Sequence, residues 1–85
     1  MTYHVEILQS AAKDLQRIHP DDRVRIITAL QKLANDPRPP GCKKLSNRPA
    51  WRIRIGAYRV IYEIFDQKLM VLVVAAGKRS EIYRR

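Results

Sequence analysis

The sequence predicts an α+β fold, in which an N-terminal strand and a helical hairpin pack on a mainly antiparallel four-stranded sheet. Three observations predict it. Residues 2–8 alternate between apolar and polar side chains, residues 10–34 carry apolar side chains at helical spacing, and residues 50–76 form apolar segments of strand length. This order of elements is typical of a sheet covered on one face by a helical pair. A chain of 85 residues has the size of one domain, so we expect residues 1–85 to form a single domain.

Two helices are predicted after the N-terminal strand. Ser10 is a favourable N-cap for the first helix, and His19-Pro20 should end it. Asp21 should cap the second helix, which Asn35-Asp36-Pro37 should end. The first helix is expected to bury Ala11, Leu15 and Ile18. The second is expected to bury Val24, Ile27, Leu30, Leu33 and Ala34, with Ile26 beside them.

A hairpin with one apolar and one cationic face is predicted for residues 50–65. Apolar side chains from Trp51 to Ile55 alternate with Arg52 and Arg54, and Gly56-Ala57 then suits a type II′ turn. That turn sets Arg54 directly opposite Arg59 on the neighbouring strand. Like charges in this position are destabilising, so we interpret the pair as a site that holds an anion.

The third strand of this half should bring further functional groups to the same end of the sheet. A short turn at Asp66–Lys68 returns the chain beside the hairpin, and residues 76–77 then lie near Arg59. Arg79 would emerge close to Arg54 and Arg59, and Tyr83 follows shortly afterwards. Four arginines and a phenol could therefore converge on one patch, for which phosphate is the obvious ligand.

Charge is divided unequally along the chain. The net charge is +9, yet residues 1–37 carry five basic and five acidic side chains, whereas residues 38–85 carry twelve basic and three acidic ones. Charge that served solubility alone would not be expected to segregate in this way. The basic half therefore favours nucleic acid or an acidic protein as partner. Loop residues Lys43, Lys44 and Arg48 add to this charge, although loop lysines are often merely solvated.

Several classes of protein are disfavoured by what the sequence lacks. No apolar run approaches the ~20 residues of a membrane span, and the N-terminus does not resemble a signal peptide. The single cysteine, Cys42, fits a reducing compartment, so we expect a cytoplasmic protein without contact to membranes. No carboxylates have the spacing of a metal site and no glycine-rich phosphate loop is present, so we expect no cofactor.

The sheet half resembles the RelE/ParE superfamily of toxins from toxin–antitoxin systems, and it looks closest to the RelE branch. The matching segments are Trp51-Arg52-Ile53-Arg54, Tyr58-Arg59-Val60-Ile61-Tyr62 and Gly77-Lys78-Arg79 with Ser80-Glu81-Ile82-Tyr83. The resemblance covers nearly the whole chain, including the order of its elements. It implies a RelE-like, microbial RNase-like fold.

For function, the resemblance implies a ribosome-dependent endoribonuclease that cleaves mRNA in the ribosomal A site by attack of an RNA 2′-OH. It implies a cognate antitoxin as partner, and contact with operon DNA only through the toxin–antitoxin complex. The catalytic set that it implies is Arg52, Arg54, Arg59, Arg79 and Tyr83. Contacts to RNA or the ribosome are expected from Lys43, Lys44, Arg48, Lys78, Arg84 and Arg85.

The identity of the general base stays open at this point. The better-known RelE pattern has lysines at the positions of Arg52 and Arg54, and an arginine does not lose its proton. Tyr83 or water must then act as base, with Lys78 a weaker candidate; His4 and His19 are badly placed for this role. Two alternatives also stay open: a ParE-like inhibitor of DNA gyrase with the same fold, and an RNA-binding module without catalysis.

Overall fold

The computed structural model describes residues 2–78 and shows helices and strands in the order predicted, with one additional strand. The helices are α1 (Gln9–Gln16) and α2 (Pro20–Lys32). The strands are β1 (His4–Ile7), β2 (Lys43–Lys44), β3 (Trp51–Ile55), β4 (Tyr58–Phe65) and β5 (Met70–Lys78). A 3₁₀ turn at Asp66–Lys68 joins β4 to β5, as expected for that segment.

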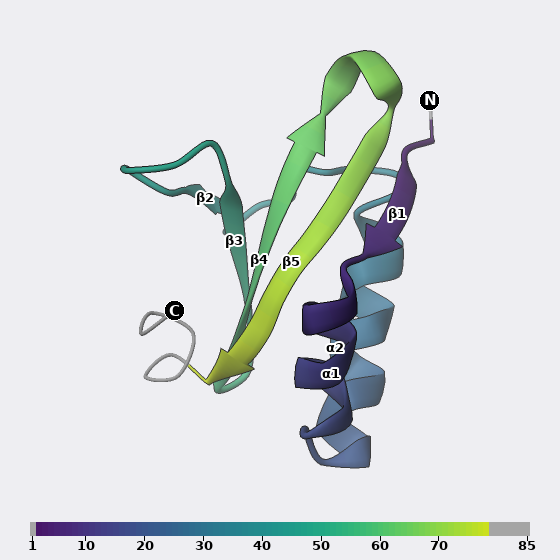
Figure 1. Cartoon of the computed structure of the whole chain (residues 1–85), viewed down its shortest axis with the longest axis vertical. Helices are drawn as coiled ribbons and strands as arrows, with labels where there is room; N and C mark the ends of the chain where they lie inside the picture. Colours follow the sequence, from purple (N-terminus) through teal and green to yellow (C-terminus); the bar gives the residue numbers. More distant parts are fainter. Residues whose placement is uncertain (1, 79–85) are drawn as a thin grey trace.

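The strands form one sheet in the order β1-β5-β4-β3-β2, so the predicted α+β class is confirmed (Figure 1). β1 pairs with β5 in parallel, and the other neighbours are antiparallel. The sheet has five strands within residues 2–78, and the prediction of four was wrong. The extra strand is β2, in which Lys43 pairs with Arg52 and Lys44 with Trp51. Two consecutive lysines show no alternation, so the sequence pattern gave no sign of this strand.

The register of the β3–β4 hairpin is the predicted one. Ile55 pairs with Tyr58, and Arg54 pairs with Arg59. Gly56 has φ +60°, whereas Ala57 does not adopt a positive φ, as the first and second loop positions of a type II′ turn require. On the other side of β4, Arg59 pairs with Gly77, so the end of β5 reaches the arginines as expected.

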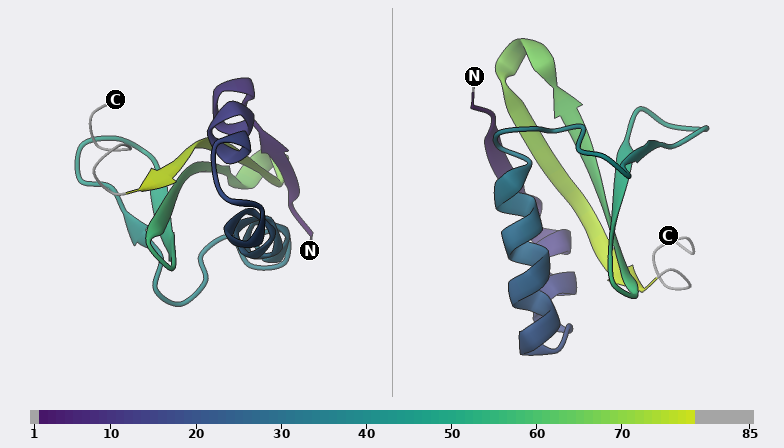
Figure 2. Two further views of the ribbon diagram at one scale, coloured as in Figure 1. Left: turned by 90° about the horizontal axis from the view of Figure 1, so that it is seen from below. Right: turned by 180° about the vertical axis from the view of Figure 1, so that it is seen from behind.

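The main core lies between the helices and the apolar face of the sheet. Ile53, Val60 and Tyr62 project into it, together with side chains of β5 and of both helices. Figures 1 and 2 show both helices on one side of the sheet, where α1 packs against β5 and α2 contacts β3. Because side chains alternate along a strand, the arginines beside Ile53 and Val60 project from the opposite face.

Asp14 of α1 accepts a hydrogen bond from the backbone of β5, a contact that was not predicted from the sequence. β1 pairs with β5 only as far as Val73, and within residues 2–78 no other strand pairs with β5 on that side beyond this residue. Asp14 of α1 is 5% exposed, and its carboxylate accepts a hydrogen bond of 3.2 Å from the backbone N–H of Ala76. A carboxylate can be buried here because it is hydrogen-bonded to a strand donor.

Both helix starts differ from the predictions. α1 begins at Gln9 with Leu8 at the N-cap, so Ser10 is not the cap. α2 begins at Pro20, and the ring Nδ1 of His19 accepts a hydrogen bond of 3.2 Å from the N–H of Asp21. Pro20 fits the first helical position because proline has no N–H and a fixed φ. Histidine is an unusual N-cap residue, whereas aspartate is a common one, so the sequence favours Asp21 as the cap.

The buried face of α2 is rotated slightly about the helix axis relative to the predicted one. Ile26, Leu30 and Leu33 are buried at i, i+4 and i+7, whereas Val24 is 64% and Ile27 is 37% exposed. The prediction that Val24 and Ile27 are buried was therefore wrong. Both stripes have helical spacing, so periodicity alone could not separate them. Neither helix within residues 2–78 is long and apolar enough to cross a membrane.

Replacing Tyr62 with phenylalanine should lower the free energy of unfolding by roughly 1–3 kcal/mol, the cost of leaving a buried acceptor unsatisfied. The Tyr62 ring is fully buried, and its hydroxyl donates a 2.8 Å hydrogen bond to the carbonyl oxygen of Pro37. Burial raises the pKa of this phenol, so it stays a donor at physiological pH. Urea denaturation of both proteins measures the difference. An unchanged midpoint and slope would contradict the assignment of this bond.

Candidate nucleic-acid interface

Three of the predicted catalytic arginines meet on the face of the sheet opposite the main core. Arg52 and Arg54 project from β3, and Arg59 projects from β4 directly opposite Arg54. Ile53 lies between the first two and faces the core, which fixes both arginines on the other face. Their common placement thus follows from hairpin register and strand alternation alone.

These arginines line a small pocket, here called the arginine pocket, of about 110 Å³. The described residues around it are Gly41, Lys43, Arg52, Arg54 and Arg59; this set includes no helix residue and no acidic side chain. Arg59 is only 7% exposed, Arg52 is half-buried and Arg54 is exposed. Guanidinium groups so close together repel one another, and an anion between them relieves this repulsion. Their planar donor geometry suits the oxygens of a phosphate.

The wall of the pocket formed by Gly41 is held by contacts that the sequence did not suggest. Arg38 donates two hydrogen bonds to Asp66, with Nη1 to Oδ1 at 3.2 Å and Nη2 to Oδ2 at 2.9 Å. The hydroxyl of Tyr3 donates to the same Oδ1 at 2.6 Å, and the Arg38 guanidinium lies 5.1 Å from the centre of the Trp51 ring. This cluster ties residues 37–41 to the turn between β4 and β5. It therefore positions one wall of the arginine pocket.

The Arg38–Asp66 pair should give stability a specific pH dependence. Hydrogen bonds from Arg38 and then from Tyr3 lower the pKa of Asp66 to about 2. A carboxylate whose pKa is depressed in the folded state stabilises that state above its unfolded pKa, and loses this effect as the pH falls through the folded pKa. The Tm difference between the unaltered protein and an Asp66→Asn variant should therefore be largest near neutral pH and shrink between about pH 4 and pH 2.

Thermal unfolding of both proteins between pH 7 and pH 2 measures this effect. Asp21→Asn is the matched control, because the Asp21 side chain is 93% exposed and lies 3.9 Å from His19. Its Tm difference should stay near zero over the acidic range. A constant Tm difference for Asp66→Asn over the whole range would contradict the role of the ionised Asp66.

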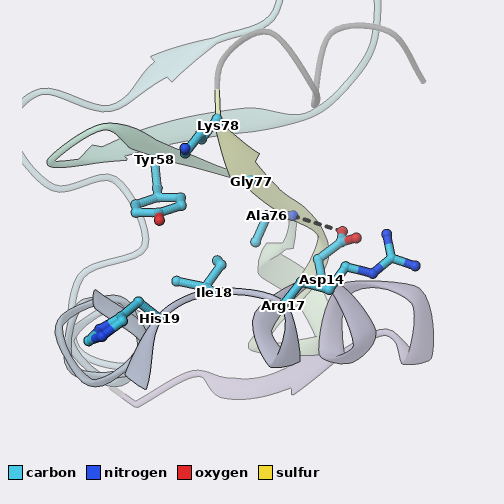
Figure 3. A pocket seen from close by; sticks show the side chains of 8 residues that line it. All are labelled: Asp14, Arg17, Ile18, His19, Tyr58, Ala76, Gly77 and Lys78. Atoms are coloured by element: carbon cyan, nitrogen blue, oxygen red, sulfur yellow. Dashed lines mark hydrogen bonds between the residues drawn. The ribbon is translucent and has the colours of Figure 1, made fainter. Parts of the chain in front are cut away.

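A larger cavity lies on the other side of the sheet, and the three arginines are not among its described lining residues. Its volume is about 540 Å³, and it lies between the α1–α2 turn and the ends of β4 and β5. Figure 3 shows Tyr58 and Lys78 on one side of it and the Asp14 carboxylate, bonded to Ala76, on another. Arg17 and His19 also line it. Its cations do not converge on one point in this view, so the arginine pocket is the better candidate for phosphate.

The other predicted site residues are distributed as follows. Lys43 lines the arginine pocket, and Lys44 is exposed beside it on β2. Arg48 lines a second depression, together with Ile61 and Glu63 of β4. Lys78 pairs with Tyr58 and lines the cavity of Figure 3 rather than the arginine pocket. Arg79, Tyr83, Arg84 and Arg85 lie outside the described residues.

Gly41, Arg38 and Asp66 were missed at the sequence level. Gly41 has φ +91°, and the proline-rich segment around it was a possible signal for an ordered loop, although not for its contact with the arginines. Arg38 and Asp66 are 28 residues apart, and no local pattern joins them. Among residues 2–78, no three His, Cys, Asp or Glu side chains are close enough to hold a metal ion.

Comparisons with known proteins agree on the kind of protein. Residues 5–83 match the family described as ParE toxin of type II toxin-antitoxin system, parDE. The chain is 31% identical to Toxin RelG of Mycobacterium tuberculosis, covering 100% of both chains. It is 27% identical to mRNA interferase toxin RelE of Escherichia coli K12, covering 98% of this chain and 92% of the relative.

Solved structures give the same result for the fold. The archaeal RelE–RelB complex from Pyrococcus horikoshii OT3 contains a chain with a TM-score of 0.82 and 27% identity, with 93% of this chain and 97% of that chain covered. The overall arrangement of helices and strands is thus shared with a solved RelE chain. The protein belongs to the ParE toxin family of type II toxin–antitoxin systems and is a RelE-like toxin.

Proposed function

We propose that this toxin is a metal-independent endoribonuclease that cleaves mRNA in the ribosomal A site and so inhibits translation in the cytoplasm. The observation that carries the proposal is the arginine pocket, in which Arg54 and Arg59 are directly opposed and Arg52 lies beside them. The similarity to a protein named mRNA interferase toxin RelE supports RNA as the substrate.

The proposed reaction needs three functions. The 2′-OH of the RNA attacks the adjacent phosphorus, a base takes its proton, and an acid protonates the departing 5′-oxygen. The products are a 2′,3′-cyclic phosphate and a 5′-OH. The arginines of the pocket hold the phosphate and stabilise the additional negative charge of the phosphorane. They do not act as bases, because arginine remains protonated.

The base and acid come from outside the arginine pocket in this proposal. Tyr83 or water supplies proton transfer, and Arg79 adds a further cation to the phosphate. Lys78 is a weaker candidate, since it lines the cavity of Figure 3 on the other face. A site with so few groups for proton transfer gains from a partner that orients the RNA for in-line attack. The ribosome has this role in the proposal.

An antitoxin is the proposed regulator. RelE chains have been solved in complex with RelB antitoxins from several organisms, including Pyrococcus horikoshii OT3. We expect the cognate antitoxin of this toxin to be acidic or amphipathic and to cover the arginine pocket, with any contact to operon DNA made through the complex. Protection of Arg52 and Arg54, which are half-buried and exposed in the free toxin, from arginine-selective modification in the complex is the expected result. Equal modification of free and bound toxin would contradict it.

The test of the proposed activity uses purified toxin, ribosomes programmed with a defined mRNA, and the same mRNA alone. Primer extension maps the ends of the mRNA fragments in both samples. Cuts within the A-site codon and only on the ribosome are expected. A folded toxin that cuts neither sample would refute the proposal. The description of the matched family names the ParE toxin, so inhibition of DNA gyrase is the second candidate function. A folded toxin that cuts neither mRNA sample would favour this candidate, and a supercoiling assay with DNA gyrase would then test it.

A further inference from the structure

A second depression lies on the arginine-bearing face next to the arginine pocket. Its volume is about 400 Å³, which is within the usual range for small-molecule sites. It is lined by Leu8, Ser10, Arg48, Ile61, Glu63, Val74 and Ala75, and we call it the Glu63 depression. Along β4, Ile61 lies between Arg59 and Glu63, and it pairs with Arg52 of the arginine pocket. The two hollows are therefore neighbours on one surface.

The floor of the Glu63 depression is aliphatic. Ile61 is 4% exposed and packs with Ala50, Val74 and Ala75. Among residues 2–78, none of the side chains that line the depression is aromatic. A flat ring could lie against this floor, but it would be held by aliphatic contact and polar groups rather than by stacking on another ring.

Glu63 is the polar group best placed to select a ligand. Its side chain is 31% exposed, and the Nη2 atom of Arg48 lies 4.0 Å from its Oε2 atom. That separation exceeds hydrogen-bond length, and a partly exposed ion pair of this kind contributes little. No hydrogen bond to the Glu63 carboxylate is present within residues 2–78. Its oxygens can therefore accept hydrogen bonds from a ligand.

A carboxylate on a surface that binds RNA can contact only some of the groups that RNA presents. It repels phosphate, so it weakens binding to an RNA backbone. It can instead accept hydrogen bonds from the amino groups of bases, as acidic side chains do with cytosine N4. In single-stranded RNA the Watson–Crick edges are free for such contacts. Glu63 lies four residues from Arg59, or about 13 Å along the strand, a distance that a flanking nucleotide spans.

We propose that the Glu63 depression binds a base of the RNA next to the phosphate in the arginine pocket, and that Glu63 selects bases with an amino group. This inference rests on the proposed function. Guanine should bind best, because its adjacent N1–H and N2–H donors match the two carboxylate oxygens. Cytosine and adenine offer one amino group each. Uracil should bind worst, because carbonyl oxygens flank its one N–H and face the carboxylate.

Titration with mononucleotides tests the base site without any cleavage. The probes are GMP, CMP, AMP and UMP, and the readout is the methyl NMR signals of Ile61, Val74 and Ala75. GMP should shift these signals with a Kd about 10-fold lower than UMP, as expected for one well-made pair of hydrogen bonds. Glu63→Gln should reduce this ratio to below about 3-fold, because an amide also donates and no longer carries charge. Equal Kd values for the four probes, or no shift at these methyls, would overturn the inference.

Glu6→Gln is the matched control. Glu6 is exposed and lies on the same side of the sheet, because Leu72 of β5 pairs with both Glu6 and Glu63. It does not line the Glu63 depression. This variant changes the net charge by the same amount, so it should leave the ratio of Kd values for GMP and UMP unchanged. A loss of the ratio in both variants would show an effect of net charge and overturn the role of Glu63.

Cleavage of a panel of programmed ribosomes separates this inference from the proposed function. The panel places each of the four bases on either side of the cut. Glu63→Gln should shift the distribution of cut sites towards sequences with uracil while cutting continues. A toxin that cuts with the same distribution before and after the substitution overturns the base site and leaves the nuclease intact. Base-dependent binding by a toxin that cuts nothing supports the base site and refutes the nuclease.

Discussion

Replacing Arg59 with alanine should lower the rate of mRNA cleavage by about 100-fold to 1,000-fold, the cost of removing one donor aimed at charge that develops in the transition state. Arg59 is 7% exposed, is directly opposite Arg54 and lines the arginine pocket. Arg59→Lys should retain part of the activity, because it keeps the charge but loses the planar donor pair. Single-turnover cleavage on programmed ribosomes, together with growth inhibition in cells, measures these effects.

Two controls keep this prediction specific. Arg59→Met preserves much of the side-chain volume, so a folded Arg59→Met variant with low activity would separate lost chemistry from lost packing. Arg17→Ala removes an exposed arginine that lines the cavity of Figure 3 and should leave cleavage unchanged. Full toxicity of Arg59→Ala at equal expression would show that the arginine pocket is not the active site.

Replacing Tyr83 with phenylalanine should slow cleavage by about 100-fold or more while ribosome binding changes little, since positioned proton transfer contributes about 10²–10⁴-fold. Tyr83 lies outside the described residues, and this prediction rests on its hydroxyl alone. The phenylalanine retains the ring, so contacts to a base are preserved. Cleavage rates and toxin sedimentation with ribosomes give the two readouts.

Tyr58→Phe is the matched control for this experiment. Tyr58 lines the cavity of Figure 3, on the side of the sheet that carries the core, so its hydroxyl should not matter for cleavage. Equal cleavage rates for Tyr83→Phe and the unaltered toxin would remove Tyr83 from proton transfer. Water would then be the remaining candidate for the base.

Local patterns predicted the parts of the fold that local physics determines. Alternation in residues 51–65 and the glycine at position 56 were enough to set Arg54 opposite Arg59, because a two-residue loop fixes the hairpin register. The same reasoning placed Gly77 beside Arg59. The core of the candidate site could therefore be predicted from one stretch of sequence.

Features that depend on distant contacts could not be predicted in this way. The rotation of α2 that buries Ile26 and exposes Val24 is decided by packing against the sheet, and both alternatives have helical periodicity. The Arg38–Asp66 pair joins a loop to a turn 28 residues away. Strand β2 exists because β3 offers it a partner, and its two lysines have no strand pattern of their own.

The central claim is that the arginine pocket binds the phosphate at which an RNA 2′-OH attacks. Ribosomes programmed with mRNA that carries a single 2′-deoxynucleotide on the 5′ side of the mapped cut test this claim most directly. We predict that this mRNA stays intact, whereas the all-ribose mRNA yields a fragment ending in a 2′,3′-cyclic phosphate. Cleavage of both at the same position and rate would mean that water or a protein group is the nucleophile, which contradicts the account.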